Sequence, residues 1–442
     1  MEKTLSRDRL IIFGRYPVPG NTKTRLIPVL GPVGAASLQR RLTEKTFLAA
    51  KAFDTRHKTT IECCFEGGTP QKIRAWLGTV PRVTFQRAGG LGLRMRAAIF
   101  EALNEGCGRV VLVGTDIPEV TAQILEEAFN ALVEHDVVLG PSTDGGYWLI
   151  GLKRPIDLFE NIDWGSPQVL GQTLAQARHQ HLTVCLLNFL SDVDTPEDFK
   201  SWKAVEHFPH IFLTVVIPTL NEEDQIERSV SSAISPNAEV IVVDGGSTDE
   251  TVPRAESLGA RIISSPLGRS LQQNRGAALA RGETLLFLHG DTRLPKGYLT
   301  EVFEILMAQG TVLGAFRFRT DFQCPSMRLV ERITQLRSKY LQLPYGDQAL
   351  FMKKATFEKT GGFPPVPIGE DLLLVRQLTK HQNARVMMAK GAAITSDRRW
   401  KTLGPLKTTW MNQLMLAGMI LGIPLETLAR LYKRSGSWIY LT

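Results

Sequence analysis

Hydrophobic residues of this chain gather into short continuous runs, and segments with helical spacing lie between them. The runs occupy residues 10–13, 110–114, 214–217 and 285–288, and the helical segments occupy residues 38–52, 94–103 and 271–281. Continuous apolar runs are typical of strands that are buried on both faces of a parallel sheet. The alternation of strand and helix therefore predicts an α/β fold, with a doubly wound sheet in each half of the chain.

The chain is long enough for more than one domain. Its 442 residues correspond to two or three domains of average size. Residues 207–212 read HFPHIF and precede a new apolar run, so we expect domains at residues 1–207 and 211–442. Hydrophobic residues make up 43% and charged residues 22%, which argues against a disordered tail, a collagen rod or a disulfide scaffold.

Cysteine usage and the lack of long apolar segments indicate where the protein works. None of the five cysteines forms a CxxC pair, so we expect reduced thiols and a cytoplasmic protein. No apolar leader segment follows the N-terminus. The longest apolar stretch, residues 414–424, is too short to span a bilayer.

Positive charge is concentrated in the last part of the chain. The formal net charge is +8, and residues 317–442 alone hold 20 Lys and Arg against 8 Asp and Glu. A pyrophosphate, a lipid head group or a nucleic acid would each suit such a surface, but no interleaved aromatic and basic stripe favours nucleic acid. Residues 410–432 predict either a packed helix or an interfacial one, which leaves peripheral contact with the inner membrane face as an alternative.

Carboxylates follow the predicted strands of the second half. Asp244 and Asp291 come after apolar runs, and ligands of such sheets bind beyond the carboxyl ends of the strands. Further polar motifs follow in the order 218–223 (PTLNEE), 244–249 (DGGSTD), 269–276 (RSLQQNRG), 289–295 (HGDTRLP), 346–348 (GDQ), 369–371 (GED) and 398–400 (RRW).

In this order the motifs resemble the family 2 glycosyltransferases, which have a GT-A fold. The resemblance covers nearly all of residues 211–434. It is closest to the branch called "transferase 2, radical-SAM/selenodomain-associated", also described as arsenosugar-biosynthesis glycosyltransferases. The resemblance implies an enzyme that moves a sugar from a nucleotide-sugar donor to an acceptor hydroxyl, by a single inverting displacement.

The resemblance also implies roles for single residues. Glu222, Asp244 and Arg269 would hold the nucleotide of the donor, and Asp291 would bind Mg²⁺ or Mn²⁺ through the diphosphate. Hard oxygen ligands suit these cations. His289 stands where the family's metal motif often has its first Asp.

Three residues are assigned to the acceptor side by the same resemblance. Asp371 would be the base that deprotonates the acceptor hydroxyl, a role for which a partly buried carboxylate is suited. Arg399 and Trp400 match the end of the family's RW element, which lines the acceptor side.

The first half carries a comparable set of loops. A glycine- and proline-bearing loop with Lys23 and Arg25 follows the first apolar run, and such a loop is suited to phosphate binding. Carboxylate loops follow at residues 114–118 (GTDIP), 142–148 (STDGGYW) and 192–198 (DVDTPED). Three separated carboxylate loops at predicted strand ends form the pattern of a site for a metal and a nucleotide.

This second set resembles the "transferase 1, radical-SAM/selenodomain-associated" branch, which is GT-A-like and related to small nucleotidyltransferases. The resemblance covers about residues 10–202 and implies phosphate contacts by Lys23 and Arg25. It further implies metal binding by Asp116 and Asp194, with Asp144 facing the substrate. Both glycosyl and nucleotidyl transfer need this cradle, so the two activities stay open.

The sequence thus predicts a fusion of two GT-A domains that work on sugar nucleotides. The expected partners are a nucleotide-sugar donor and a small-molecule or lipid acceptor, with no nucleic acid. One alternative is a membrane-associated enzyme that glycosylates a lipid or carotenoid. Another is a chain whose N-terminal half is a non-catalytic scaffold module, against which the intact Asp116, Asp144 and Asp194 argue.

Overall fold

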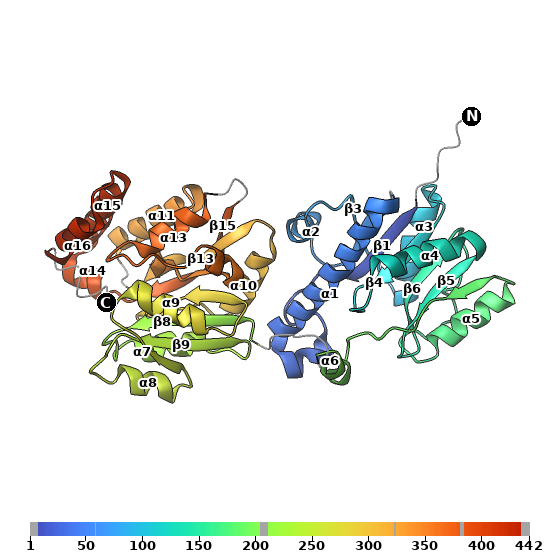
Figure 1. The fold of residues 1–442 in the computed structure, drawn as a ribbon, viewed down its shortest axis with the longest axis horizontal. Coiled ribbons are helices and arrows are strands. Elements are labelled where there is room, and N and C mark those ends of the chain that lie inside the picture. The colour runs from blue at the N-terminus through green and yellow to red at the C-terminus, as the bar shows by residue number, and fades with distance from the viewer. Residues whose placement is uncertain (1–7, 58, 204–210, 322–323, 381–383, 435–442) are drawn as a thin grey trace. The chain divides into compact units, whose positions relative to one another are not determined.

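The computed structural model describes residues 8–57, 59–203, 211–321, 324–380 and 384–434 (Figure 1). The chain divides into two compact units, Met1–Phe208 and Pro209–Thr442. Each unit is built on one twisted sheet with helices packed against it. The side chain of Arg399 and residues 435–442 lie outside the described part.

The N-terminal unit has a seven-stranded sheet in the order β3-β2-β1-β4-β6-β5-β7. Its strands are β1 (Arg9–Arg15), β2 (Thr60–Glu66), β3 (Arg82–Phe85), β4 (Val110–Gly114), β5 (Val137–Pro141), β6 (Tyr147–Leu152) and β7 (Val184–Leu186). The first four are parallel, while β6 pairs antiparallel with both β4 and β5. The two predicted apolar runs form β1 and β4, which are almost completely buried.

The C-terminal unit has an eight-stranded sheet in the order β10-β9-β8-β11-β14-β13-β15-β12. Its strands are β8 (Leu213–Thr219), β9 (Ala238–Asp244), β10 (Arg261–Ser264), β11 (Thr284–Phe287), β12 (Thr292–Arg293), β13 (Thr311–Thr320), β14 (Leu350–Lys353) and β15 (Arg385–Thr395). The strands β10, β9, β8 and β11 are parallel, and β14 pairs antiparallel with β11.

The two sheets therefore repeat one arrangement. In each, four parallel strands in the order third, second, first, fourth are followed by an antiparallel strand beside the fourth. The prediction of an α/β sheet in each half is confirmed, and both folds are of the GT-A type. The sheets are mixed rather than fully parallel, because β6 and β14 run opposite to the strands on either side of them. Buried apolar runs do not reveal this direction.

Helices connect the strands of both units. The N-terminal unit has η1 (Thr24–Leu26), α1 (Ile27–His57), α2 (Pro70–Leu77), α3 (Leu91–Asn104), α4 (Ala122–Glu134), α5 (Val169–His179) and α6 (Pro196–Lys203). The C-terminal unit has α7 (Ile226–Ala233), α8 (Thr251–Ser257), α9 (Arg269–Leu279), α10 (Tyr298–Met307), α11 (Pro325–Tyr340), η2 (Gly346–Gln348), α12 (Lys354–Lys359), α13 (Glu370–Leu378), α14 (Arg398–Leu403), α15 (Pro405–Ile420) and α16 (Leu425–Arg434). Helix α9 lies directly on the sheet, because Gly276 meets the side chains of Val216 and Val243 without a side chain of its own.

The region predicted as one helix at residues 410–432 forms two. Helices α15 and α16 are separated by a turn with Gly422 and Pro424, where the glycine has a positive φ and the proline cannot continue the first helix. They lie side by side (Figure 1) and bury a cluster that includes Met415, Leu428 and Tyr432. In the described part of the chain, no helix combines the length and apolar character that crossing a bilayer requires.

Candidate functional site

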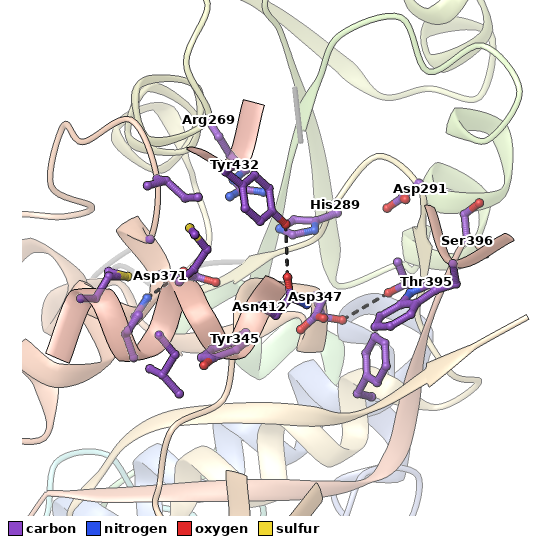
Figure 2. A pocket seen from close by; sticks show the side chains of 18 of the residues that line it. Arg269, His289, Asp291, Tyr345, Asp347, Asp371, Thr395, Ser396, Asn412 and Tyr432 are labelled. Atoms are coloured by element: carbon purple, nitrogen blue, oxygen red, sulfur yellow. Dashed lines mark hydrogen bonds between the residues drawn. The ribbon is translucent and has the colours of Figure 1, made fainter. Parts of the chain in front are cut away.

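A cavity of about 180 Å³ lies in the C-terminal unit, at the side where β11, β12 and β15 end or begin (Figure 2). Eight of its lining residues belong to the motifs quoted above: Arg269, His289, Asp291, Asp347, Gly369, Asp371, Arg398 and Trp400. Figure 2 shows Asp371 and Tyr345 on one side of the cavity, and Asp291 and Ser396 on the other. Glu222 and Asp244 are not among the lining residues.

Asp244 organises the turn after β9. Its Oδ2 accepts hydrogen bonds from the backbone N–H groups of Gly246 and Ser247 at 2.9 and 3.0 Å, and its Oδ1 accepts one from the Ser247 hydroxyl at 2.5 Å. Asn221 ties the preceding loop to this turn, because its side chain accepts the Thr248 N–H at 2.9 Å. The turn after β8 and the turn after β9 thus form one rigid platform at the strand ends.

Glu222 and Asp291 form a pair of neighbouring carboxylates, and the positive charge of Arg398 acts on both of them. Arg398 donates to Glu222 Oε2 in a short ion pair. Burial and the nearby charge of Asp291 raise the pKa of Glu222 to about 7. Burial also raises the pKa of Asp291, although Arg398 opposes that shift. A divalent cation placed here would relieve the repulsion between the two carboxylates.

Asp291 does not terminate β11 directly. The strand ends at Phe287, and Asp291 lies on the short loop to β12, where its Oδ1 accepts a hydrogen bond from the Thr292 hydroxyl at 3.2 Å. Its carboxylate lines the cavity, where it can bind a hard cation that enters with the ligand. Within the described ranges, no three or more His, Cys, Asp or Glu side chains are grouped to hold a metal alone. The residues therefore fit a cation that takes most of its ligands from a bound diphosphate and water.

His289 is a neutral imidazole at the centre of the cavity. Burial, with the nearby positive charge of Arg269, lowers the pKa of His289 to about 3. A neutral ring can accept a hydrogen bond or ligate a metal, but it cannot supply positive charge at neutral pH.

Glu370 and Asp371 are adjacent in sequence and have different environments. Glu370 is 3% exposed and forms a short ion pair with Arg269. Asp371 lines the cavity, and its Oδ2 accepts the N–H of Gly346 at 2.6 Å. Helix α13 begins directly after Gly369, which adopts a left-handed conformation. Adjacent side chains of a helix point in different directions, so Glu370 and Asp371 diverge.

The acceptor-side prediction concerns α14. Trp400 lines the cavity and is 7% exposed, with its ring centroid 6.2 Å from that of Phe318. Arg399 lies in the same helix, but its side chain falls outside the described residues. Its neighbour Arg398, which the sequence analysis did not assign, is the residue that reaches Glu222.

The N-terminal unit brings four of its five predicted residues together. The ammonium group of Lys23 lies 2.8 Å from Asp116 Oδ1 and 3.8 Å from Asp194 Oδ1, and it donates to the Val193 carbonyl at 2.7 Å. The Lys23 side chain is only 3% exposed. Arg25 is well exposed and lies 2.9 Å from Asp194 Oδ2. These contacts join the loop after β1 to the loops after β4 and β7.

Asp144 does not take part in these ion pairs. It is exposed, and its Oδ1 accepts the N–H of Gly146 two residues later at 2.9 Å. Asp192 was not assigned from the sequence, yet its environment is perturbed. Burial and the negative charge of Asp144 raise the pKa of Asp192 to about 6. Its alternation with Asp194 in the DVD motif was the signal that could have pointed to it.

Two family models match the chain. Residues 49–166 match "Uncharacterized protein conserved in bacteria (DUF2064)", and residues 214–359 match "Glycosyl transferase family 2". A "putative nucleotide-diphospho-sugar transferase" from Desulfovibrio desulfuricans G20 is 33% identical, over 46% of this chain and 89% of that chain, with a TM-score of 0.43. The chain belongs to the nucleotide-diphospho-sugar transferases.

Curated relatives of this chain match a smaller segment. An uncharacterized glycosyltransferase of Rickettsia bellii is 37% identical over 98 residues, which is 22% of this chain and 33% of that protein. The glucosyl-3-phosphoglycerate synthase of Mycolicibacterium paratuberculosis is 39% identical over 93 residues, 18% of this chain and 28% of that protein. The matched segment thus spans about a third of the length of these relatives.

The C-terminal unit contains three contacts that the sequence did not predict. They are the pairs Arg269–Glu370 and Arg398–Glu222 and the hydrogen bond from Gly346 to Asp371. Each joins residues that lie 25 to 176 positions apart. Only the folded sheet brings such partners together, so a motif order alone does not reveal them.

Proposed function

We propose that the C-terminal unit transfers a sugar from a nucleotide-sugar donor to an acceptor hydroxyl. The observation that carries the proposal is the position of Asp371, whose carboxylate faces a cavity shared with Asp291 while Gly346 holds one of its oxygens. The base and the metal-side carboxylate occupy different sides of that cavity (Figure 2), as a displacement between donor and acceptor requires.

The proposed step is a single displacement with inversion. Asp371 takes the proton of the acceptor hydroxyl, the acceptor oxygen bonds to the anomeric carbon, and the bond from that carbon to the diphosphate breaks. The nucleoside diphosphate leaves with the electron pair. Mg²⁺ or Mn²⁺, held by Asp291, would neutralise the charge on the leaving diphosphate.

We assign donor binding to the turns after β8 and β9. Glu222 and Asp244 stand on these turns, and the Asp244 carboxylate keeps the second turn in shape for a base or ribose. Arg269 lines the cavity, where its charge would favour a diphosphate even while it pairs with Glu370. Trp400 and Arg399 are assigned to the acceptor side.

The N-terminal unit is proposed as a second transferase on sugar nucleotides, either glycosyl or nucleotidyl. The cluster of Lys23, Asp116 and Asp194 supports this, because a buried ammonium between two carboxylates keeps them close together. A metal cation could then take the place of the Lys23 ammonium, or a phosphate could take the place of one of the carboxylates. In this role the unit would make the activated donor or perform a second transfer. A scaffold role is the alternative.

The cellular setting is part of the proposal as well. The order of motifs supports sugar-conjugate biosynthesis of the arsenosugar type, in a cytoplasmic enzyme. A lipid or carotenoid acceptor at the inner membrane face is the alternative, and the +12 net charge of residues 317–442 would then favour contact with anionic lipids.

A donor panel tests the proposed function. The full chain is incubated with UDP-, GDP- and dTDP-sugars, with Mg²⁺, Mn²⁺ or EDTA, and the release of nucleoside diphosphate is recorded. We expect one nucleotide class to be hydrolysed or transferred, and EDTA to stop the reaction. If no donor is bound or turned over under any of these conditions, the proposed function is wrong.

A matched assay addresses the N-terminal unit. Nucleoside triphosphates and sugar phosphates are supplied together, and pyrophosphate release is measured for the native chain and for Asp116→Ala. Release that depends on Asp116 supports nucleotidyl transfer. The scaffold alternative is supported instead if the native chain releases no pyrophosphate and Asp116→Ala leaves sugar transfer unchanged.

A further inference from the structure

One side of the C-terminal cavity is formed by a single face of α15. Asn412, Met415, Leu416 and Met419 all line the cavity, and their spacing of three, four and seven residues places them on one face of a helix. The opposite face points away, since Trp410 and Leu414 are 64% and 41% exposed. Helix α15 therefore separates the cavity from solvent.

The apolar surface continues beyond α15. Met415 belongs to a buried cluster with Ile368 and Tyr432, and Met419 packs against the same cluster. The Tyr432 hydroxyl donates to Asn412 Oδ1 at 3.2 Å, so the polar atom has a partner and the ring lies at the cavity. We call Ile368, Leu372, Met415, Leu416, Met419 and Tyr432 the apolar wall.

The apolar wall adjoins the proposed base. Ile368 and Leu372 stand three residues before and one residue after Asp371, and the Met419 methyl group packs against Gly369. Gly346 also contacts Asp371, and a Cβ added at residue 346 would be 2.9 Å from Nε2 of His289. Figure 2 shows His289 between Asp371 and Asp291, where the diphosphate is proposed to lie. The part of an acceptor beyond its hydroxyl must therefore extend along the apolar wall.

The charges of the cavity disfavour an anionic acceptor. Of its two arginines, Arg269 is assigned to the donor diphosphate and Arg398 pairs with Glu222 beside the proposed metal site. No lysine lines the cavity in the described part of the chain. A phosphate or carboxylate on the acceptor would face Asp291, Asp347 and Asp371 without a dedicated cation.

A polyhydroxylated acceptor is disfavoured for a different reason. Its hydroxyl groups would lose water and meet methionine and leucine side chains, and each unpaired group costs about 1–3 kcal/mol. An apolar substituent gains from the same surroundings. Methionine side chains are flexible, so the wall can accommodate more than one shape of apolar group.

From this geometry we propose that the acceptor of the C-terminal unit is an alcohol whose hydroxyl carries an apolar substituent, bound against the apolar wall. The proposal rests on the proposed function, because it assumes that Asp371 receives the acceptor proton. It predicts that 3-phosphoglycerate is not the acceptor of this chain. The name of the Mycolicibacterium relative, glucosyl-3-phosphoglycerate synthase, refers to that compound.

The first test compares acceptors of similar size. Benzyl alcohol, 1-hexanol, glycerol and 3-phosphoglycerate are supplied with the donor that the panel identifies, and transfer is measured apart from donor hydrolysis to water. We expect benzyl alcohol or 1-hexanol to be glycosylated at least about tenfold faster than glycerol or 3-phosphoglycerate at equal concentration. Equal or faster transfer to either polar acceptor overturns the proposal, even though sugar transfer itself then stands.

Variants of α15 supply the second test. Met419→Gln keeps the length of the side chain and makes it polar, and we expect it to raise the KM for the apolar alcohol about tenfold with little change in kcat or in the KM for the donor. Leu414→Gln is the control, since Leu414 lies on the exposed face of the same helix and does not line the cavity. Thermal melting confirms that both variants fold. An unchanged KM for the alcohol in a folded Met419→Gln protein contradicts the proposal.

A third measurement needs no turnover. Binding of benzyl alcohol to the full chain is followed by calorimetry between about 15 and 35 °C, a range in which proteins of this size stay folded. We expect a negative heat-capacity change that Met419→Gln reduces and Leu414→Gln does not. If no donor is ever turned over, this measurement still decides the apolar site. Absence of binding up to the solubility limit would contradict it.

Discussion

The backbone N–H of Gly346 donates a hydrogen bond to Oδ2 of Asp371 across 2.6 Å. Gly346 begins η2, and Asp371 lies in the first turn of α13, so the bond fixes the start of one helix against another. A side chain at residue 346 would crowd both His289 and Asp371. Glycine at this position therefore keeps one carboxylate oxygen oriented while the group still faces the cavity.

We predict that Asp371→Asn and Glu370→Gln have different effects. Asp371→Asn should keep donor and metal binding and lower transfer by about 10²–10⁴-fold, because general base catalysis is lost. Glu370→Gln should instead lower the melting temperature, since it weakens a buried ion pair with Arg269 and does less harm to the chemical step. Single-turnover transfer and thermal melting of both variants check this. Near-native transfer by Asp371→Asn together with failure of Glu370→Gln would reverse the two roles.

A second prediction concerns Asp291. Asp291→Ala should abolish metal-dependent donor turnover while the fold survives, because the carboxylate lies where the diphosphate is expected. Titration of Mn²⁺ into the variant in the presence of donor measures the effect. Asp321→Ala is the control, because Asp321 is partly exposed and pairs with Arg293 away from the cavity lining. Normal metal dependence in Asp291→Ala would remove Asp291 from the site.

Lys23 and Arg25 offer a matched pair in the N-terminal unit. Lys23→Met should destabilise the unit by about 1–3 kcal/mol, because it leaves Asp116 and Asp194 close together without the buried ammonium. Arg25→Met should change stability by less than about 0.5 kcal/mol, since Arg25 is 70% exposed and such surface pairs contribute little. Urea denaturation compares the two. Equal losses would mean that the buried position of Lys23 is unimportant.

The raised pKa of Asp192 predicts a pH-dependent effect. Burial and Asp144 raise this pKa to about 6, so the folded state holds its proton more tightly than the unfolded state. The stabilising contribution of the protonated form is complete only below the ordinary Asp pKa of 3.8 and is lost as the pH rises through about 6. Asp192→Asn removes the charge, and it should raise the melting temperature more at pH 7 than at pH 4. The same increment at both pH values would speak against a buried, repelled carboxylate.

The two units are expected to fold separately. Each has its own sheet and core, so residues 1–207 and 211–442 should each give a cooperative unfolding transition when expressed alone. Circular dichroism during heating measures both fragments and the full chain. Aggregation of both fragments from a chain that is well behaved as a whole would place the boundary elsewhere.

Local pattern was sufficient to predict the strands that precede the candidate site residues. The runs that became β1, β4, β8 and β11 are apolar along their whole length because both faces of these strands are covered. In parallel strands with that burial, the next polar residues fall at the carboxyl edge. Asp116, Asp244 and Asp291 could therefore be placed near a site before any contact was known.

The antiparallel strands and the break between α15 and α16 were harder to predict from the sequence. Strands β6 and β14 are as apolar as their parallel neighbours, so their direction depends on the connections around them. The pattern of residues 410–432 predicts one helix despite Gly422 and Pro424, and the sequence did not show that α16 folds back onto α15. That arrangement depends on which apolar faces find each other in space.

What the sequence by itself determined was the type of fold, its repetition and the edge of each sheet where polar residues gather. These features follow from local periodicity, which is a property of neighbouring residues. Only the tertiary structure decided that Glu370 pairs with Arg269 while Asp371 faces the cavity, and that Met419 lies beside them. The physical reason is distance along the chain: these partners are brought together by the register and packing of whole elements, which no short stretch of sequence encodes.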